Sequence, residues 1–175
     1  MIVHYPYQEG FDAVDVWTDT DHAGCVSTRK STSGGVLMLG SHLVKAWSTT
    51  QSVIALSSGE AEYYGLVKGA SIGIGIKSML SDFGVPVSVV VHTDSSAAKG
   101  IGSRRGLGKL RHIELAELWI QDLVSRGKIS IVKIAGADNF ADALTKHSSR
   151  DRLLQHMSNT NQYVAQGRHP ITPSA

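Results

Sequence analysis

The stretch Val-Ser-Val-Val-Val-His-Thr-Asp-Ser, residues 87–95, is the strongest strand signal in the chain and runs directly into an acidic residue. Only Ser88 interrupts the apolar run, and Gly-Val-Pro at 84–86 separates it from the preceding segment. A strand that is apolar at nearly every position is buried on both faces, so residues 87–91 are expected to form a central strand of a sheet. Asp94 then lies beyond the carboxyl end of that strand, where α/β sheets place their ligand sites.

A second apolar run, residues 12–19, ends in the same way. It finishes on Thr18-Asp19, just as the central strand finishes on Thr93-Asp94. If the two strands are neighbours in the sheet, the two carboxylates meet at one edge. Asp21 competes with Asp19 for this position, and Asp19 is preferred because it stands directly at the strand end.

The other patterns alternate between strands and helices. Two apolar runs bounded by glycines predict a hairpin over 34–40 and 43–47. A capping box of Ser57 and Glu60 starts a long helix that reaches about Phe83. Glycines at 65, 69, 73 and 75 lower the intrinsic helicity of this segment, and they also permit close packing on a sheet. The later segments are a short helix over 95–101, a basic loop over 102–108, an amphipathic helix over 110–124, a strand over 129–134 and a final helix from Asp138 or Asn139 to about His156.

This order of elements predicts an α/β fold with a mixed five-stranded sheet. Three leading strands imply an antiparallel meander, and the later strands are separated by helices, which implies parallel crossovers. Residues 1–12 are expected to be a connector, residues 13–156 the folded domain, and residues 157–175 a disordered tail.

Composition narrows the classes of function. A chain of 175 residues with 42% hydrophobic residues has room for one domain with a core. No run approaches the ~20 apolar residues of a membrane span, and the N-terminus lacks the order of a signal peptide. Cys25 is the only cysteine, which excludes an internal disulfide and argues against a cysteine-based zinc site. An intracellular, reducing setting is therefore expected.

Charge is informative locally rather than overall, because the net charge is only +2. No acidic residue occurs between Asp94 and Glu114, although several basic residues do. A positive segment of this kind suits a polyanion, and a solvated basic loop is an equally good interpretation of the charge alone. The basic residues are Lys99, Arg104, Arg105, Lys109 and Arg111.

Four acidic residues stand out together. Asp19 and Asp94 end strands, and Glu62 and Asp142 stand early in the long helix and in the final helix. Each alone is explained by a turn or a helix cap, but the coincidence of four favours a shared site. Carboxylates are the ligands that Mg²⁺ prefers, and two such ions ~4 Å apart can hydrolyse a phosphodiester.

Six ordered motifs carry a family resemblance. They are residues 17–25 (Trp-Thr-Asp-Thr-Asp-His-Ala-Gly-Cys), 28–35, 55–66 (Ala-Leu-Ser-Ser-Gly-Glu-Ala-Glu-Tyr-Tyr-Gly-Leu), 92–98, 110–114 and 137–146 (Ala-Asp-Asn-Phe-Ala-Asp-Ala-Leu-Thr-Lys). In this order they resemble the ribonuclease H domain of copia-type retrotransposon polyproteins, over about residues 13–147. The resemblance implies a ribonuclease H-like fold that cleaves the RNA strand of an RNA–DNA hybrid with Mg²⁺ or Mn²⁺.

The resemblance also implies roles for individual residues. Asp19, Glu62, Asp94 and Asp142 match the metal-binding acids of the family. Glu60 competes with Glu62, which is preferred because Tyr-Tyr-Gly-Leu follows it as in the family motif. The loop at 135–139 lacks the histidine that cellular ribonucleases H commonly carry there, which bears on turnover and product release more than on metal binding. His112 is the most family-like histidine, and a structural hydrogen bond is its expected role.

The sequence and the family resemblance also suggest which residues contact the substrate and which partners the chain has. The candidates for phosphate contacts are Lys99, Arg104, Arg105 and Lys109, with Ser95 and Ser96 reaching the backbone and Gly24 letting a main-chain amide approach a sugar. The partners implied are the hybrid and an upstream reverse transcriptase region, in the cytoplasm or in virus-like particles. Two alternatives stay open: a degenerate nucleic-acid-binding scaffold that keeps the fold, and a nuclease of this architecture that acts on DNA.

Overall fold

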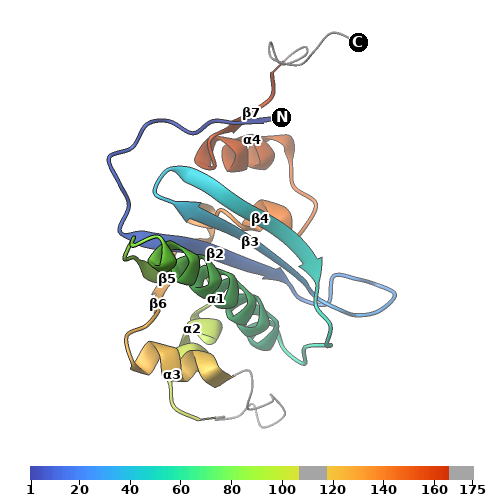
Figure 1. The fold of residues 1–175 in the computed structure, drawn as a ribbon. Coiled ribbons are helices and arrows are strands. Elements are labelled where there is room, and N and C mark those ends of the chain that lie inside the picture. The colour runs from blue at the N-terminus through green and yellow to red at the C-terminus, as the bar shows by residue number, and fades with distance from the viewer. Residues whose placement is uncertain (107–117, 166–175) are drawn as a thin grey trace.

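A computed structural model describes residues 1–106 and 118–165 of the chain, and its elements alternate much as the sequence patterns do (Figure 1). The strands are β1 (Ile2–Val3), β2 (Ala13–Asp21), β3 (Thr32–Leu39), β4 (His42–Thr50), β5 (Ser88–Thr93), β6 (Ser130–Lys133) and β7 (Gln162–Tyr163). The helices are α1 (Ser58–Asp82), α2 (Ser96–Ser103), α3 (Trp119–Ser125) and α4 (Arg150–Asn159), with 3-10 turns η2 (Gly136–Asp138) and η3 (Asp142–Leu144).

The main sheet has five strands in the order β4-β3-β2-β5-β6. β2 pairs with β3, and β3 with β4, in antiparallel fashion, whereas β5 is parallel to both β2 and β6. This confirms the predicted mixed sheet and the interior position of β5, whose Val89 and Val91 are buried. β2 and β3 extend further than the predicted runs 12–19 and 34–40, to Asp21 and from Thr32, so the connection between them spans only residues 22–31.

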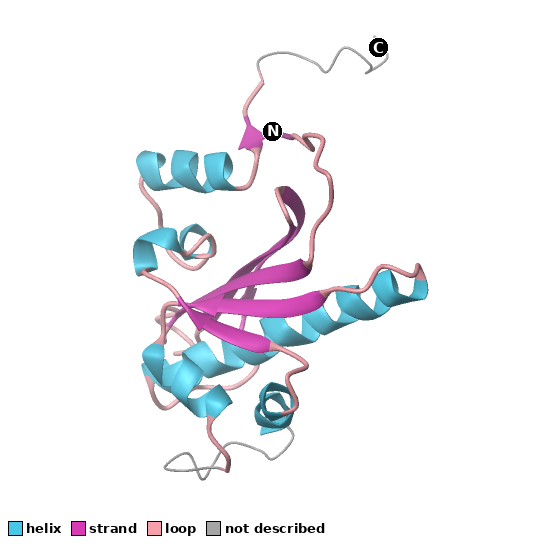
Figure 2. Ribbon diagram, turned by 90° about the vertical axis from the view of Figure 1, so that its left-hand side faces the viewer, coloured by secondary structure: helices cyan, strands magenta, loops and turns pink. Residues whose placement is uncertain are grey.

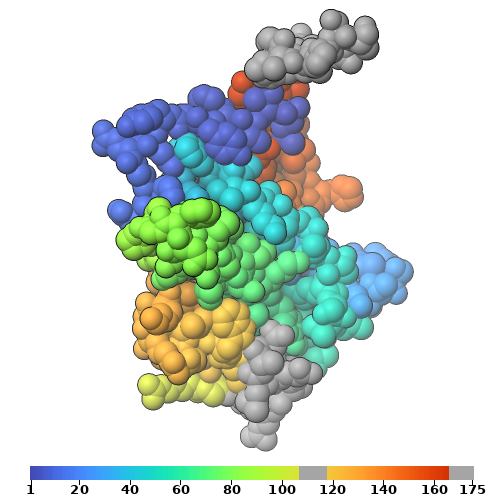
Figure 3. Space-filling model, viewed as in Figure 1, coloured from blue at the N-terminus to red at the C-terminus, as the bar shows by residue number. Residues whose placement is uncertain are grey.

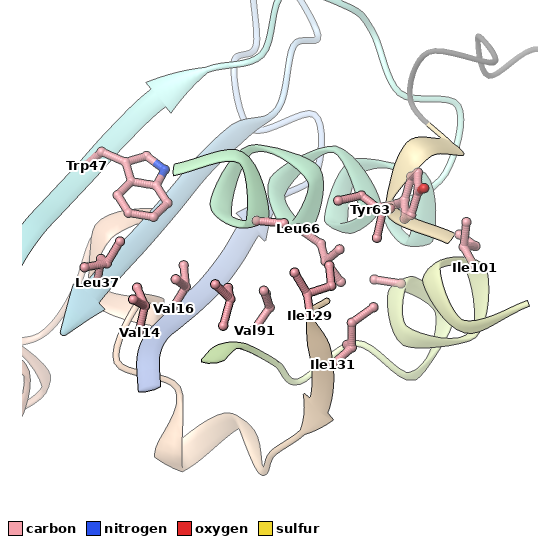
Figure 4. Close-up of a cluster of buried hydrophobic side chains, with 14 of the residues drawn as sticks. Val14, Val16, Leu37, Trp47, Tyr63, Leu66, Val91, Ile101, Ile129 and Ile131 are labelled. Atoms are coloured by element: carbon pink, nitrogen blue, oxygen red, sulfur yellow. The ribbon is translucent and has the colours of Figure 1, made fainter. Parts of the chain in front are cut away.

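The core lies between the sheet and α1 (Figure 4). Valines of β2 and β5 face Tyr63 and Leu66 of α1, and isoleucines of α2 and β6 extend the cluster. Burying each such side chain contributes roughly 1.5–3 kcal/mol, so this layer holds the helix in place. Ser57 caps the helix by accepting a hydrogen bond from the Glu60 N–H, as the capping box predicts.

Three glycines allow α1 to approach the sheet closely. A β-carbon on Gly65 or Gly69 would overlap Thr20 or Thr18 of β2, and one on Gly73 would lie 2.9 Å from Val89. They are four residues apart and therefore share one face of the helix. The expectation that these glycines serve packing is confirmed at these three positions, whereas Gly75 faces open space.

The 3-10 turn η3 packs on the face of the sheet opposite α1, and α4 lies beyond it, against η3 and β7 (Figure 2). On this face Trp17 stacks against His92 of β5 and against Phe140, at centroid distances of 4.6 and 4.4 Å. His156 of α4 bonds the Phe140 carbonyl through Nδ1 at 2.8 Å. The stack therefore ties the segment between η2 and η3 to both the sheet and the last helix.

The prediction of one final helix from Asp138 or Asn139 to His156 was wrong. Two 3-10 turns come first, and α4 begins only after Ser149, whose side chain accepts a hydrogen bond from the Arg152 N–H. The Asn139 side chain accepts from the Ala141 N–H and donates to the Thr18 carbonyl of β2. Side chains that bond nearby backbone groups in this way compete with helix formation.

The two ends of the described chain lie together. β1 and β7 form a two-stranded antiparallel sheet, and the first residues run beside the C-terminal segment (Figure 3). The expected tail at 157–175 is thus structured at its start, because α4 reaches Asn159 and β7 follows it. Residues 166–175 and most of the predicted helix at 110–124, up to residue 117, lie outside the described residues. Within the described ranges no helix is long and apolar enough to cross a membrane.

Candidate metal centre

Three of the four predicted acids converge at the carboxyl ends of β2 and β5. Thr18 and Thr93 are register partners of these parallel strands, so the residues that follow them lie side by side, Asp19 within β2 and Asp94 just past the end of β5. Glu62 joins them from the second turn of α1. Carboxylate oxygens of the three residues all lie within 4.8 Å of one another, and we call this group the acidic cluster.

The two glutamates near the start of α1 have different surroundings. Glu60 is 2% exposed, and its Oε2 accepts a hydrogen bond from the Leu56 N–H at 3.0 Å. It therefore fixes the chain just before the helix start, one residue earlier than the Ser57 N–H that the glutamate of a capping box accepts from. Glu62 points into the acidic cluster instead, so the geometry favours it over Glu60 as a metal ligand.

The Asp19 carboxylate is nearly enclosed, at 4% exposure, and accepts a hydrogen bond from the Thr145 hydroxyl. Burial raises its pKa above the ordinary aspartate value, and the charges of Asp94 and Asp142 raise it further. The Thr145 hydrogen bond and the Lys146 charge oppose this rise. Thr145 was not singled out from the sequence, although it stands within the motif at 137–146.

Glu62 is the most perturbed member of the cluster. Burial, with the charges of Asp19 and Asp94, raises its pKa to about 8, against a smaller opposing effect of a backbone hydrogen bond from Thr20. Its Oε2 is buried and has no hydrogen-bond partner among the described residues. A buried, unpaired carboxylate oxygen beside two further carboxylates is costly without a cation, and it suits the oxygen-ligand preference of Mg²⁺.

Asp142 occupies a different position from that predicted. It is the first residue of η3 rather than an early residue of a helix, and it stands outside the group of three. Its Oδ1 accepts from Lys146 Nζ at 2.6 Å, and its Oδ2 from Arg152 Nη1 at 2.8 Å. It is close enough to the cluster for its charge to raise the pKa of Asp19.

The loop before Asp142 passes over the acidic cluster. A β-carbon at Gly136 would lie 3.3 Å from Asp94 Oδ2, so the absence of a side chain lets the backbone approach that carboxylate. Asn139 is 6% exposed and anchors the loop to β2 through the Thr18 carbonyl at 3.0 Å. The loop at 135–139 contains no histidine.

The predicted substrate contacts are distributed around α2. Ser95 caps this helix by accepting from the Ala98 N–H, Ser96 and Arg105 are exposed, and Lys99 and Arg104 are half-buried. Gly24 does have a close neighbour, but it is the Asp21 carboxylate, which a β-carbon at Gly24 would overlap. Lys109 lies outside the described residues. None of the described positions among them contributes to the acidic cluster itself.

We expect the stability of the metal-free chain to fall between pH ~4.5 and pH ~8 because of Glu62. In that range the unfolded chain loses the Glu62 proton while the folded chain, with a pKa of about 8, retains it. The contribution of protonated Glu62 to the free energy of unfolding is fully present below the pKa that Glu62 has in the unfolded chain. It is lost as the pH rises through the pKa that Glu62 has in the folded chain. The pH dependence of the unfolding free energy is measured by urea unfolding of the parent and of Glu62→Gln at pH 5, 6, 7 and 8, without divalent ions.

The Glu62→Gln variant should gain stability relative to the parent as the pH rises, because it keeps a neutral side chain throughout. Glu9→Gln is the matched control, since Glu9 is exposed. If the difference in unfolding free energy between the parent and Glu62→Gln stays constant from pH 5 to pH 8, the raised pKa of Glu62 is contradicted. Adding Mg²⁺ should stabilise the parent more at pH 8 than at pH 5, because protons and cations compete for the same carboxylate.

Sequence comparison places the chain among retroelement proteins. It is 30% identical over 139 residues to the "Retrovirus-related Pol polyprotein from transposon TNT 1-94" of Nicotiana tabacum, which covers 78% of this chain. It is also 30% identical over 141 residues to the corresponding polyprotein from transposon RE2 of Arabidopsis thaliana, covering 79% of this chain. The matched region is 10% of the length of each relative. No protein-family model matches the chain.

Structure comparison gives the fold. The N-terminal RNase H domain of Rv2228c from Mycobacterium tuberculosis superposes with a TM-score of 0.52 at 20% identity, covering 84% of this chain and 97% of that one. LC11-RNase H1, isolated from compost, gives a TM-score of 0.53 at 17% identity, covering 82% and 99%. At such identities the likeness concerns the fold. Together the sequence and structure comparisons identify the chain as a domain with the ribonuclease H fold from a retrotransposon-type Pol polyprotein.

Proposed function

We propose that the chain is an endoribonuclease that cleaves the RNA strand of RNA–DNA hybrids by divalent-metal-assisted hydrolysis. The observation that carries the proposal is the acidic cluster. Asp19, Glu62 and Asp94 come from three separate elements and place carboxylate oxygens within 4.8 Å of one another, and Glu62 Oε2 is buried without a partner among the described residues. Carboxylates held this close together repel one another and have lost contact with water, which is costly without a counter-charge. A bound cation would supply that counter-charge.

Mg²⁺, for which Mn²⁺ is the expected substitute, would supply a water activated at neutral pH and stabilise charge on the leaving oxygen. Asp19, Glu62 and Asp94 would hold one ion, and Asp142 together with Asp19 would serve a second. Thr145 keeps the Asp19 carboxylate in a fixed orientation through its hydroxyl. Gly136 lets the neighbouring loop approach Asp94, and Asn139 anchors that loop to β2.

The choice of an RNA–DNA hybrid as the substrate rests on the family resemblance. The proposed role in reverse transcription rests on that resemblance and on the length of the relatives. Those relatives are Pol polyproteins about ten times longer than the matched region, which supports an upstream reverse transcriptase region as a partner. We infer the same intracellular location for the chain as for the nucleic acid it would process, in the cytoplasm or in virus-like particles.

The test is a cleavage assay with three labelled substrates: an RNA–DNA hybrid, duplex DNA and duplex RNA of one sequence. We expect cleavage of the hybrid's RNA strand alone, only with Mg²⁺ or Mn²⁺, and its loss on chelation. Recognition of the 2′-hydroxyl beside a DNA strand gives this pattern. Cleavage of duplex DNA at a comparable rate would instead indicate a DNA nuclease.

The ion pairs of Asp142 with Lys146 and Arg152 favour one alternative, a scaffold that keeps the fold but not the chemistry. In that case one of the four acids is committed to structural contacts. The scaffold binds the hybrid, with or without metal, and leaves the RNA strand intact at every metal concentration. The same assay, with binding followed by fluorescence anisotropy, therefore separates the two.

A further inference from the structure

Two basic side chains share the single carboxylate of Asp142. Lys146 reaches Oδ1 from the end of the motif at 137–146, and Arg152 reaches Oδ2 from the first turn of α4. Their side chains are 47% and 60% exposed, and that of Asp142 is 21% exposed. Ion pairs this exposed contribute little to stability, typically 0–1 kcal/mol, so structural support alone is a weak reason for the arrangement.

A cavity of about 480 Å³ adjoins these two cations, between the 3-10 turns and α4. Its volume is in the range of about 300–1,000 Å³ that small-molecule sites occupy. Among the described residues of its lining, Asp142 is the only acidic one. With Lys146 and Arg152 charged and His156 neutral, the lining carries +1 with Asp142 and +2 without it. Further polar side chains of the lining are Asn139, Gln155, His156 and Asn159.

We propose that Lys146 and Arg152 form a binding site for a backbone phosphate of the nucleic-acid strand, next to the acidic cluster. The Asp142 carboxylate pairs with both of these cations. If Asp142 turned instead to a divalent ion at the cluster, both cations would lose their partner, and a phosphodiester would replace it. The site rests on the proposed function, because it requires a nucleic-acid substrate and an Asp142 that engages metal.

The chemistry of the two cations suits this role. A guanidinium can donate two parallel hydrogen bonds to phosphate oxygens, and an ammonium adds a compact charge. Both come from the segment that also carries Asp142 and Thr145, so a bound phosphate would be held in a fixed relation to the acidic cluster. Arg150 stands two residues from Arg152 on α4, is exposed and does not line the cavity, which makes it a matched control.

The experiment measures hybrid affinity as a function of salt with Ca²⁺ in place of Mg²⁺, so that all four acids are retained and bound RNA stays uncut. Affinity is determined by fluorescence anisotropy between 50 and 200 mM KCl. Each phosphate neutralised contributes about 0.9 to the slope of log affinity against log salt. Lys146→Met/Arg152→Met should therefore reduce the slope by about 1, whereas Arg150→Met should leave it unchanged.

Charge-conserving variants separate a phosphate site from a structural role. Lys146→Arg and Arg152→Lys should retain the parental slope, and thermal unfolding checks that the double variant is folded. If it is not, each single Met variant is measured in its place, with the same direction expected. A slope equal to that of the parent overturns the proposal, as does an equal decrease in Arg150→Met. Because hybrid cleavage by the unaltered chain is measured separately, failure of this site is distinguished from failure of the proposed function.

Discussion

Replacing Asp94 by asparagine is expected to lower the rate of hybrid cleavage more than about 100-fold. Mutating a residue that merely supports a metal ligand already lowers metal affinity or activity by about 10–100-fold. The substitution removes one charge and keeps the shape of the side chain. Asp94 stands at the end of β5, close to both other carboxylates of the acidic cluster. Its charge is one cause of the raised pKa of Glu62, so the variant should also bring that pKa down.

The measurements are a single-turnover cleavage rate at saturating Mg²⁺ and a urea unfolding curve for each protein. The unfolding free energy of Asp94→Asn should equal or exceed that of the metal-free parent, because carboxylate repulsion is relieved. Asp122→Asn is the matched control: its carboxylate is 53% exposed, pairs with Arg126 on α3, and should leave cleavage unaltered. Cleavage by Asp94→Asn at close to the parental rate would refute the metal role of the cluster.

The acidic cluster could be anticipated because its geometry follows from strand order. Two apolar runs that each end in Thr-Asp place both carboxylates at one edge once their strands are parallel neighbours, and β2 and β5 are. The family motif favoured Glu62 over Glu60, and the structure agrees, because the Glu60 carboxylate accepts a hydrogen bond from the Leu56 N–H at the helix start. In these places local sequence and long-range packing agree.

The surroundings of Asp142 could not be anticipated, because they depend on contacts between residues far apart. The helix pattern over 138–156 is broken by Asn139, which bonds the Thr18 carbonyl 121 residues earlier in the chain. Arg152 lies ten residues from Asp142 and meets it only because the chain turns between η3 and α4. Likewise, β7 forms because β1 is present to pair with it, whereas its own sequence suggests disorder.

Substituting alanine for Gly69 should destabilise the chain by about 1–3 kcal/mol, the usual cost of overpacking a core. Alanine is the better helix former by ~1 kcal/mol, so propensity alone predicts the opposite sign. The added methyl group, however, would overlap Thr18 Cγ2, and Thr18 is fully buried in β2, next to Asp19. Either the threonine or the helix must move, and α1 carries Glu62 with it. Urea unfolding with Mg²⁺ absent measures the change.

Gly75→Ala is the matched control, because it makes the same substitution in the same helix where a β-carbon meets no atom within 4 Å. It should stabilise the chain by roughly 0.5–1 kcal/mol, as expected for an exposed helix position. Opposite signs for the two variants would establish that contact with β2, rather than helix propensity, sets the requirement for glycine at 69. Equal stabilisation by both would mean that α1 can shift freely on the sheet. Hybrid cleavage then provides the link to function: Gly69→Ala should lose activity beyond its loss of folded protein, since moving α1 separates Glu62 from Asp19 and Asp94.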